Sequence, residues 1–244
     1  MLPRRLIVLS VIAACLVADA ASAIEPSTNE RGAAGAWVQG TLESRAAASL
    51  PFSFGYGGKP SGGLIGSWKR DVSVRTLESG RTERTISLID PANGLEVRCV
   101  AATFDDFPAV EWMLTFKNGG QADTPILTDV QALDACFGPG LPGRRFRLYH
   151  AAGSRALVND FQPRQTELGE NGLLNLASSG GRSSDGNLPF FNLAFPGGGG
   201  VALAIGWTGQ WAASFRGLTR GRIQIRAGME LVHTTLHPGE EIRS

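Results

Sequence analysis

Hydrophobic and polar residues alternate with a period of two along most of the chain from Ala36 onward. Residues 95–101 read Leu-Glu-Val-Arg-Cys-Val-Ala, and the same alternation recurs over residues 110–117. Alternation of this kind places one set of side chains on a buried face of a strand and the other set toward solvent. The pattern therefore predicts β-strands, with few helices in the chain.

Turn residues separate these runs. The sequence DPANG at 90–94 and NGG at 118–120 both contain Asn-Gly, which supplies the positive φ angles that tight hairpins need. Strands are expected at residues 85–89, 95–101, 110–116, 125–133, 190–195, 201–207, 211–215, 222–226 and 229–236. Roughly a dozen short, closely spaced strands are typical of an all-β fold, a large antiparallel β-sandwich.

The alternation weakens between Gly138 and Ser184. Pro139, Pro142 and Pro163 interrupt this segment, and a Gly/Ser-rich stretch follows at 169–184. It is expected to form long connections with one or two edge strands. Hairpins continue on both sides, so residues 36–244 are expected to form one domain, preceded by a flexible segment at 24–35.

The N-terminus has the pattern of a signal peptide at residues 1–23. Arg4 and Arg5 precede an apolar run at 6–16, and Ala-Ser-Ala at 21–23 has the form of a cleavage site. This pattern predicts export to the periplasm or the extracellular space, with a buried N-terminal helix as the alternative. The sequence at 12–15 also resembles a bacterial lipobox, so lipidation of Cys15 is a second processing route.

The composition excludes several classes of protein. The 244 residues include 23 Lys+Arg and 22 Asp+Glu, so no basic field exists to attract nucleic acid. Charged residues make up only 18% of the chain, and 12 Phe and 5 Trp are enough to build a core. These values indicate a folded domain that binds no nucleic acid.

Common catalytic and metal-binding motifs do not occur in the sequence. It contains no G-x-S-x-G, no P-loop and no H-E-x-x-H, and its histidines and cysteines have no spacing that resembles a zinc site, so no metal or cofactor is expected. Asp105 and Asp106 fit a solvated turn. Asp129 and Asp134 are five positions apart, which places them on opposite faces of a strand. Neither pair suits a glycosidase, and no catalytic residue is expected.

Two cysteines, Cys99 and Cys136, remain after signal-peptide cleavage. In an oxidising compartment an even pair permits one disulfide, whereas two buried free thiols are the alternative.

Two aromatic clusters are candidates for contact with a carbohydrate or with another domain. Trp207, Gln210 and Trp211 place two indoles and an amide around a short turn, and flat aromatic faces beside amides can stack on sugars. Phe52, Tyr56 and Lys59 lie in the Gly-rich segment PFSFGYGGK at 51–59. Burial against a second layer or a neighbouring domain is the simpler explanation for both clusters.

Several segments then appear in an order that resembles one family. PFSFGYGGKPS, WKRD, DPANGLEVRCVA, DFPAVEWMLTFKNGG, DTPILTDVQALD, GNLPFFNLAF, VALAIGWTGQW and RAGMELVHTTLHPGEEIRS resemble the N-terminal β-supersandwich domain of glycoside hydrolase family 36 α-galactosidases. The similarity extends from about Ala36 to Ser244. In that family the last segment leads into the catalytic (β/α)8 barrel, which carries both catalytic aspartates, and this sequence ends before such a barrel.

The resemblance implies a retaining α-galactosidase as the parent architecture, acting on α-galactoside oligosaccharides, with this chain inactive alone. It also implies that the domain packs on a catalytic (β/α)8 domain and, in some homo-oligomeric members, lends loop residues to a neighbouring sugar site. The expected partners of this chain are thus a catalytic (β/α)8 domain and further copies of itself in a homo-oligomer. Phe52, Tyr56, Lys59, Trp68, Lys69 and Arg70 are the residues expected to make such contacts. The alternative is a free-standing periplasmic carbohydrate-binding or structural β-sandwich module that uses Trp207, Gln210 and Trp211.

Overall fold

The computed structural model describes residues 25–44, 50–77 and 80–244. The signal peptide and the lipidation site expected within residues 1–23 lie outside this part of the chain. In the described residues the strands are β1 (Ser53–Tyr56), β2 (Lys59–Pro60), β3 (Lys69–Leu77), β4 (Arg81–Ile89), β5 (Leu95–Phe104), β6 (Val110–Asn118), β7 (Leu127–Gln131), β8 (Leu133–Phe137), β9 (Phe146–Ala151), β10 (Pro163–Leu168), β11 (Leu173–Ala177), β12 (Phe190–Ala194), β13 (Gly200–Ala204), β14 (Trp211–Leu218), β15 (Arg222–Met229), β16 (His233–Thr234) and β17 (Glu241–Arg243). The helices are α1 (Thr28–Thr41) and the short 3-10 turns η2 (Ser61–Gly63) and η3 (Ile65–Ser67).

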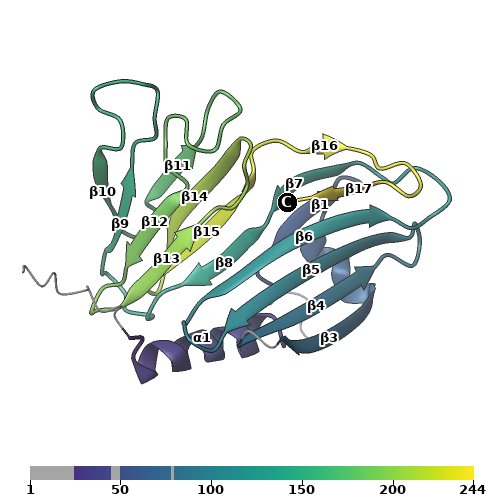
Figure 1. The fold of residues 1–244 in the computed structure, drawn as a ribbon, viewed down its shortest axis with the longest axis horizontal. Helices are drawn as coiled ribbons and strands as arrows, with labels where there is room; N and C mark the ends of the chain where they lie inside the picture. The colour runs from purple at the N-terminus through teal and green to yellow at the C-terminus, as the bar shows by residue number, and fades with distance from the viewer. Residues whose placement is uncertain (1–24, 45–49, 78–79) are drawn as a thin grey trace, which may run out of the picture.

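The strands form four antiparallel sheets that pair into two sandwiches side by side (Figure 1). In the first sandwich, the sheet β17-β6-β5-β4-β3 packs on the sheet β16-β7-β1-β2. In the second, β10-β9-β12-β13 packs on β11-β14-β15-β8. Each sandwich encloses its own cluster of buried hydrophobic side chains. The expected all-β class and large antiparallel sandwich are confirmed.

The period-two pattern determines which side chains enter each core. In β5, Leu95, Val97 and Cys99 are fully buried, while the residues between them are partly exposed. Antiparallel pairing sets Val97 beside Leu88 on one side and Phe116 on the other, so inward rows continue across the sheet. Burial of such rows against the second sheet is the main stabilising contribution to the sandwich.

Trp112 of β6 joins the two sandwiches. Its ring packs against both hydrophobic clusters, and its indole Nε1 donates a hydrogen bond to the carbonyl oxygen of Ala132 at 2.6 Å. Ala132 lies between β7, which belongs to the first sandwich, and β8, which belongs to the second. Trp37 of α1 stacks on the same indole, with the ring centroids 5.5 Å apart.

A flexible segment was expected at residues 24–35, but the structure forms the helix α1 over most of this range. Ser27 and Glu30 form a capping box, in which the Ser27 hydroxyl accepts from the Glu30 amide and the Glu30 carboxylate accepts from the Ser27 amide at 2.7 Å. This exchange satisfies two amides at the helix start. Towards the end of the helix, the side chains of Val38 and Leu42 are buried against the rest of the protein. The spacing Ser-x-x-Glu at residues 27–30 is typical of a helix start and is the feature of the sequence that could have predicted this helix.

The segment 138–184 is more ordered than its prolines suggested. It contains β9, β10 and β11, and β9 is an interior strand between β10 and β12 rather than an edge strand. Phe146 and Leu148 of β9 alternate inward and are buried. Two of the prolines lie in the connection before β9, and Pro163 begins the edge strand β10, where a missing amide donor is tolerated.

The strand expected at 229–236 is interrupted. β15 ends at Met229, and only His233–Thr234 pairs again, with β7 of the first sandwich. The chain therefore crosses here from the second sandwich back to the first.

We expect Trp112→Ala to destabilise the protein by about 2–4 kcal/mol, because it removes a large half-buried ring and leaves the Ala132 carbonyl without its donor. Trp112→Phe retains most of the packing and should cost less. Denaturant unfolding followed by intrinsic fluorescence and circular dichroism measures both. If the unsubstituted protein and both variants had the same free energy of unfolding, Trp112 would not hold the two sandwiches together.

Candidate functional site

The aromatic residues expected in a recognition loop at 51–59 belong to the core instead. Phe52, Tyr56 and Trp68 are all buried, and the rings of Tyr56 and Trp68 meet edge to face with centroids 5.8 Å apart. The cause is β1, whose alternation turns Phe54 and Tyr56 inward. Lys59 remains exposed in β2. Phe52 and Tyr56 of this segment, and Trp68 after it, therefore follow the simpler explanation, burial in the core, rather than forming an exposed loop.

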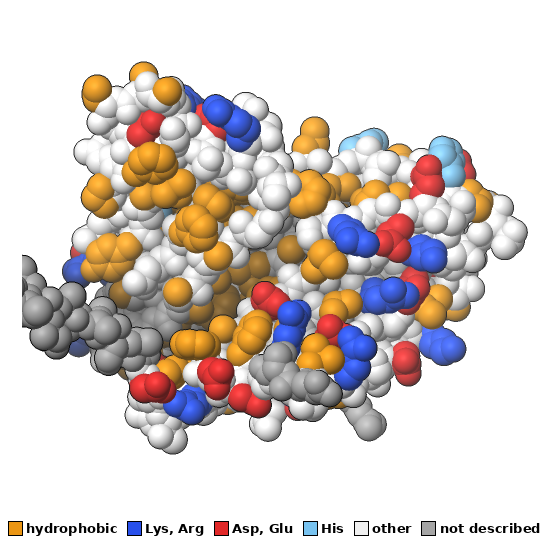
Figure 2. All heavy atoms as spheres, in the orientation of Figure 1, with side chains coloured by type: hydrophobic (Ala, Val, Ile, Leu, Met, Phe, Trp, Pro, Cys, Tyr) orange, Lys and Arg blue, Asp and Glu red, His pale blue; other side chains and the backbone are white. Residues whose placement is uncertain are grey.

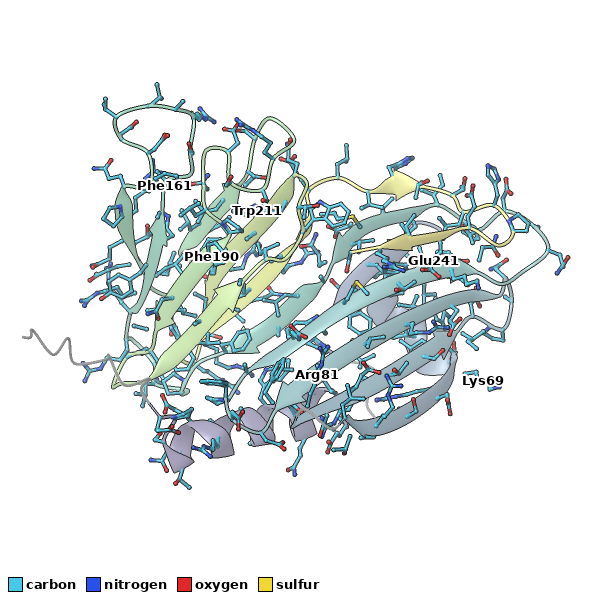
Figure 3. The ribbon with its side chains drawn as sticks, viewed as in Figure 1. Lys69, Arg81, Phe161, Phe190, Trp211 and Glu241 are labelled. Atoms are coloured by element: carbon cyan, nitrogen blue, oxygen red, sulfur yellow. The ribbon has the colours of Figure 1, made fainter. Side chains whose placement is uncertain are left out.

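The polar groups of Tyr56 and Arg70 beside this cluster have structural roles. Burial and the charge of Asp90 raise the pKa of Tyr56 to about 12, so its phenol stays protonated. Arg70 donates to the carbonyl oxygen of Leu42 at 3.3 Å, which ties β3 to the end of α1. Lys69 is exposed at the start of β3, at the outer edge of the first sandwich (Figure 3).

The second expected cluster also divides between core and surface. Trp211 is 0% exposed in the core of the second sandwich, where its Nε1 donates to the carbonyl of Ser183 at 2.7 Å. Gln210 accepts from the amide of Gly181 at 3.1 Å and donates to Glu230. Trp207 is partly buried against the same core. A platform of two exposed indoles is therefore not formed.

Cys99 and Cys136 are free thiols in different sandwiches. Cys99 faces the first core from β5, and burial raises its pKa to about 12. Cys136 is exposed on β8. The disulfide considered from the sequence is not formed between these residues, because Cys99 is enclosed in the core of the first sandwich and Cys136 lies on a strand of the second.

Asp129 and Asp134 are brought together, contrary to the expectation of opposite faces. Arg226 contacts the Asp129 carboxylate at 2.7 Å and the Asp134 carboxylate at 3.4 Å. The reason is a β-bulge: Asp129 has a φ of 49°, and the register of β7 against β1 shifts between Ser53 and Gly55. Both carboxylates are thereby held by a cation beside the crossing from β7 to β8. Asp105 and Asp106 lie in the exposed connection after β5, as expected.

Within residues 25–44, 50–77 and 80–244, no three His, Cys, Asp or Glu side chains are grouped as metal ligands would be. In the same residues, no helix has the length and apolar character required to cross a membrane.

The surface with the clearest binding character is the outer face of the sheet β10-β9-β12-β13. We call it the aromatic face, and it consists of Tyr149, Phe190, Asn192, Ala202 and Ala204. These residues line a shallow trough of about 480 Å³. Tyr149 is 39% exposed and Phe190 60%. Figure 2 shows hydrophobic side chains gathered on this lobe, whereas acidic and basic groups alternate on the other.

The strand register explains how the aromatic face forms. Gln165, Tyr149, Asn192 and Ala202 stand side by side across the four strands β10, β9, β12 and β13. The small side chains of the alanines on β13 leave space beside the larger side chains, and this space is the trough. One row away, Arg147 and Glu167 form an ion pair at 3.6 Å. A hydrogen bond with Tyr149 and the charge of Glu167 raise the pKa of Arg147, so the guanidinium stays charged at this border.

The sequence contained a signal for this face. Phe190 and Phe191 are consecutive in one strand, so only one of them can enter the core. Phe191 is buried against Trp211, with ring centroids 5.8 Å apart, and Phe190 consequently points outward (Figure 3).

Neither a protein-family model nor a curated protein matches the chain. Among solved structures, its fold resembles the GH36 α-galactosidase AgaA from Geobacillus stearothermophilus, with a TM-score of 0.56 at 16% identity over 80% of this chain and 29% of that chain. The galactosidase domain of the α-galactosidase–sucrose kinase AgaSK gives 0.57 at 17% identity, over 80% and 28%. The α-galactosidase from Lactobacillus brevis gives 0.56 at 16% identity, over 80% and 28%.

The fold is therefore that of a β-sandwich part of family 36 α-galactosidases, and the resemblance expected from the sequence is confirmed at this level. The chain spans less than a third of the length of these structures.

We expect Phe190→Ala to leave the free energy of unfolding nearly unchanged, because the ring is mostly exposed. Trp211→Ala should cost about 3–5 kcal/mol, because it opens a cavity in the core and removes the donor to Ser183. Thermal and denaturant unfolding of the two variants measures the difference. Similar losses would contradict the assignment of one ring to the surface and the other to the core.

Proposed function

We propose that the chain is a non-catalytic β-sandwich domain of an exported, α-galactosidase-like glycoside hydrolase, and that it supports a (β/α)8 catalytic domain. The observation that carries the proposal is the likeness of its fold, over 80% of the chain, to a part of three family 36 α-galactosidases. The charged N-terminal start and apolar run at 4–16 support export.

The arrangement of its carboxylates supports a non-catalytic role. Glycosidases use two carboxyl groups that flank the scissile bond, one of which must give and take a proton. Asp129 and Asp134 instead share Arg226, and Asp134 also accepts hydrogen bonds from Ser53 at 2.7 Å and Gln224 at 2.8 Å. Both carboxylates are therefore engaged in contacts that join strands of the fold, on one shared guanidinium, rather than placed on either side of a bond to be cleaved.

In this function the aromatic face is the surface that the catalytic domain covers. Its exposed rings and alanine floor resemble the apolar centre of a protein interface, and the ion pair of Arg147 and Glu167 lies where a polar rim would lie.

We expect the purified chain to show no hydrolysis of an aryl α-galactoside. Cross-linking of the tagged chain in its source cells, followed by mass spectrometry, should connect residues near Tyr149 or Phe190 to a (β/α)8 glycoside hydrolase domain, on the same polypeptide or a separate one. Phe190→Asp should remove these cross-links, while Phe107→Asp, an exposed phenylalanine of the other sandwich, should retain them.

Hydrolysis by the purified chain that is lost on substitution of its own carboxylates would overturn the non-catalytic role. Cross-links that never reach a glycoside hydrolase would overturn the supporting role.

A second candidate function, a carbohydrate-binding module, is favoured by the chemistry of the aromatic face. Tyr149 and Phe190 offer flat apolar surfaces, and the side-chain amides of Asn192 and Gln165 share the row of Tyr149. The trough carries no charge of its own, which suits a neutral sugar that stacks on a ring and bonds to amides.

If this second function holds, Tyr149→Ala and Phe190→Ala should each weaken binding of neutral oligosaccharides, including α-galactosides, by about tenfold, since each removes a stacking surface. Isothermal titration against a panel of such sugars measures the effect, with Phe107→Ala as the matched control. The absence of binding by the unsubstituted chain at millimolar sugar would exclude this function and leave the supporting role untouched.

A further inference from the structure

Strand β3 is an unusual edge. It is nine residues long, whereas the other edge strands of the four described sheets have two to six residues. It pairs with β4 without a break in register from Lys69 to Leu77 and contains no proline. Proteins normally shorten, kink or cover such an edge, because its free backbone groups can pair with another strand.

Both faces of β3 are accessible. Val72 and Val74 are on the side of the sheet that faces the core, since they stand beside Ile86 and Arg84 in rows that continue to Cys99 and Ala101. Even so, Val72 is 45% exposed and Val74 60%. On the opposite face, Asp71, Ser73 and Arg75 are exposed as well. The described part of the protein therefore leaves room on either side of this edge.

The sequence of β3 is complementary to itself. When two copies run antiparallel about Ser73, Asp71 of each stands opposite Arg75 of the other, and Val72 stands opposite Val74. Opposite charges and branched apolar residues are favourable cross-strand pairs. The remaining pairs, Arg70 with Thr76 and Lys69 with Leu77, place no like charges opposite each other.

The existing contacts suit this pairing. Arg75 already meets Glu83 of β4 at 3.0 Å, so in the pair it would lie between Glu83 and Asp71 of the partner subunit. Asp71 makes no ion pair with a described residue and is available for that contact.

We propose that two copies of this chain pair through their β3 strands about a two-fold axis at Ser73. The axis is perpendicular to the sheet, so two five-stranded sheets would join into one continuous sheet, with the cores on the same side. Val72 and Val74 of both copies would meet on the core side, and two Asp71–Arg75 pairs would flank Ser73 on the outer side. This pairing is independent of the proposed supporting role.

Charge-reversal variants test the proposal directly. Asp71→Arg places arginine opposite arginine in a homodimer, and Arg75→Asp places aspartate opposite aspartate. A mixture of the two variants restores opposite charges at both positions. Glu170→Arg, in the β10–β11 turn of the other sandwich, makes the same charge change as Asp71→Arg and serves as its control.

Sedimentation velocity over a concentration series should show that the unsubstituted chain and Glu170→Arg dimerise alike. Each β3 variant should dimerise at least about tenfold more weakly, and an equimolar mixture should recover most of the loss. A wild-type chain that stays monomeric throughout, a dimer unaffected by either variant, or a mixture that stays monomeric would each overturn the proposal.

Hydrogen exchange of the unsubstituted chain provides a second test that does not depend on the folding of any variant. The outward amides of β3 should become protected as the protein concentration rises, while those of the edge strand β10 should not. Concentration-independent exchange in β3 would also overturn the pairing.

Discussion

The shared indole of Trp112 is the constraint on which the arrangement of the two sandwiches depends. Each sandwich has its own core, and a chain with two cores would ordinarily behave as two domains joined by a linker. Here a ring that packs on both cores also donates to the backbone at Ala132, between β7 of the first sandwich and β8 of the second. Movement of one sandwich relative to the other would therefore break a hydrogen bond and expose apolar surface at once.

The polar groups beside this crossing have the same structural purpose. The bulge at Asp129 turns its carboxylate toward Arg226 of β15, and Asp134 at the start of β8 reaches the same guanidinium. Asp134 also accepts from Ser53 of β1, so one carboxylate contacts strands of both sandwiches. Asp129 and Asp134, which by residue type could suggest a pair of catalytic acids, thus hold strands of the fold together.

Period-two alternation was sufficient to predict the fold class, because it depends only on which side chains can face a core. It failed where the outcome depended on partners distant in sequence. Residues 138–184 were expected to supply only one or two edge strands, yet the neighbouring strands β10 and β12 make β9 interior. The burial of Trp211 likewise depends on Phe191 and on the Ser183 carbonyl, neither of which its local sequence reveals. Aromatic residues near glycines fit both a recognition loop and a core, and the structure places Phe52, Tyr56 and Trp68 in the first core.

The two surfaces that remain, the aromatic face and the β3 edge, have different physical characters and belong to different sandwiches. The aromatic face offers rings that project from the interior strands β9 and β12, so side-chain contacts would hold what covers it. The β3 edge offers a backbone with one side unpaired by any described strand, so a strand is the complementary partner. Since Phe190 lies on the second sandwich and Asp71 on the first, a partner domain on one surface leaves the other available for a second copy. The two proposals therefore use separate sets of residues, one for a catalytic domain and one for a second copy of the chain.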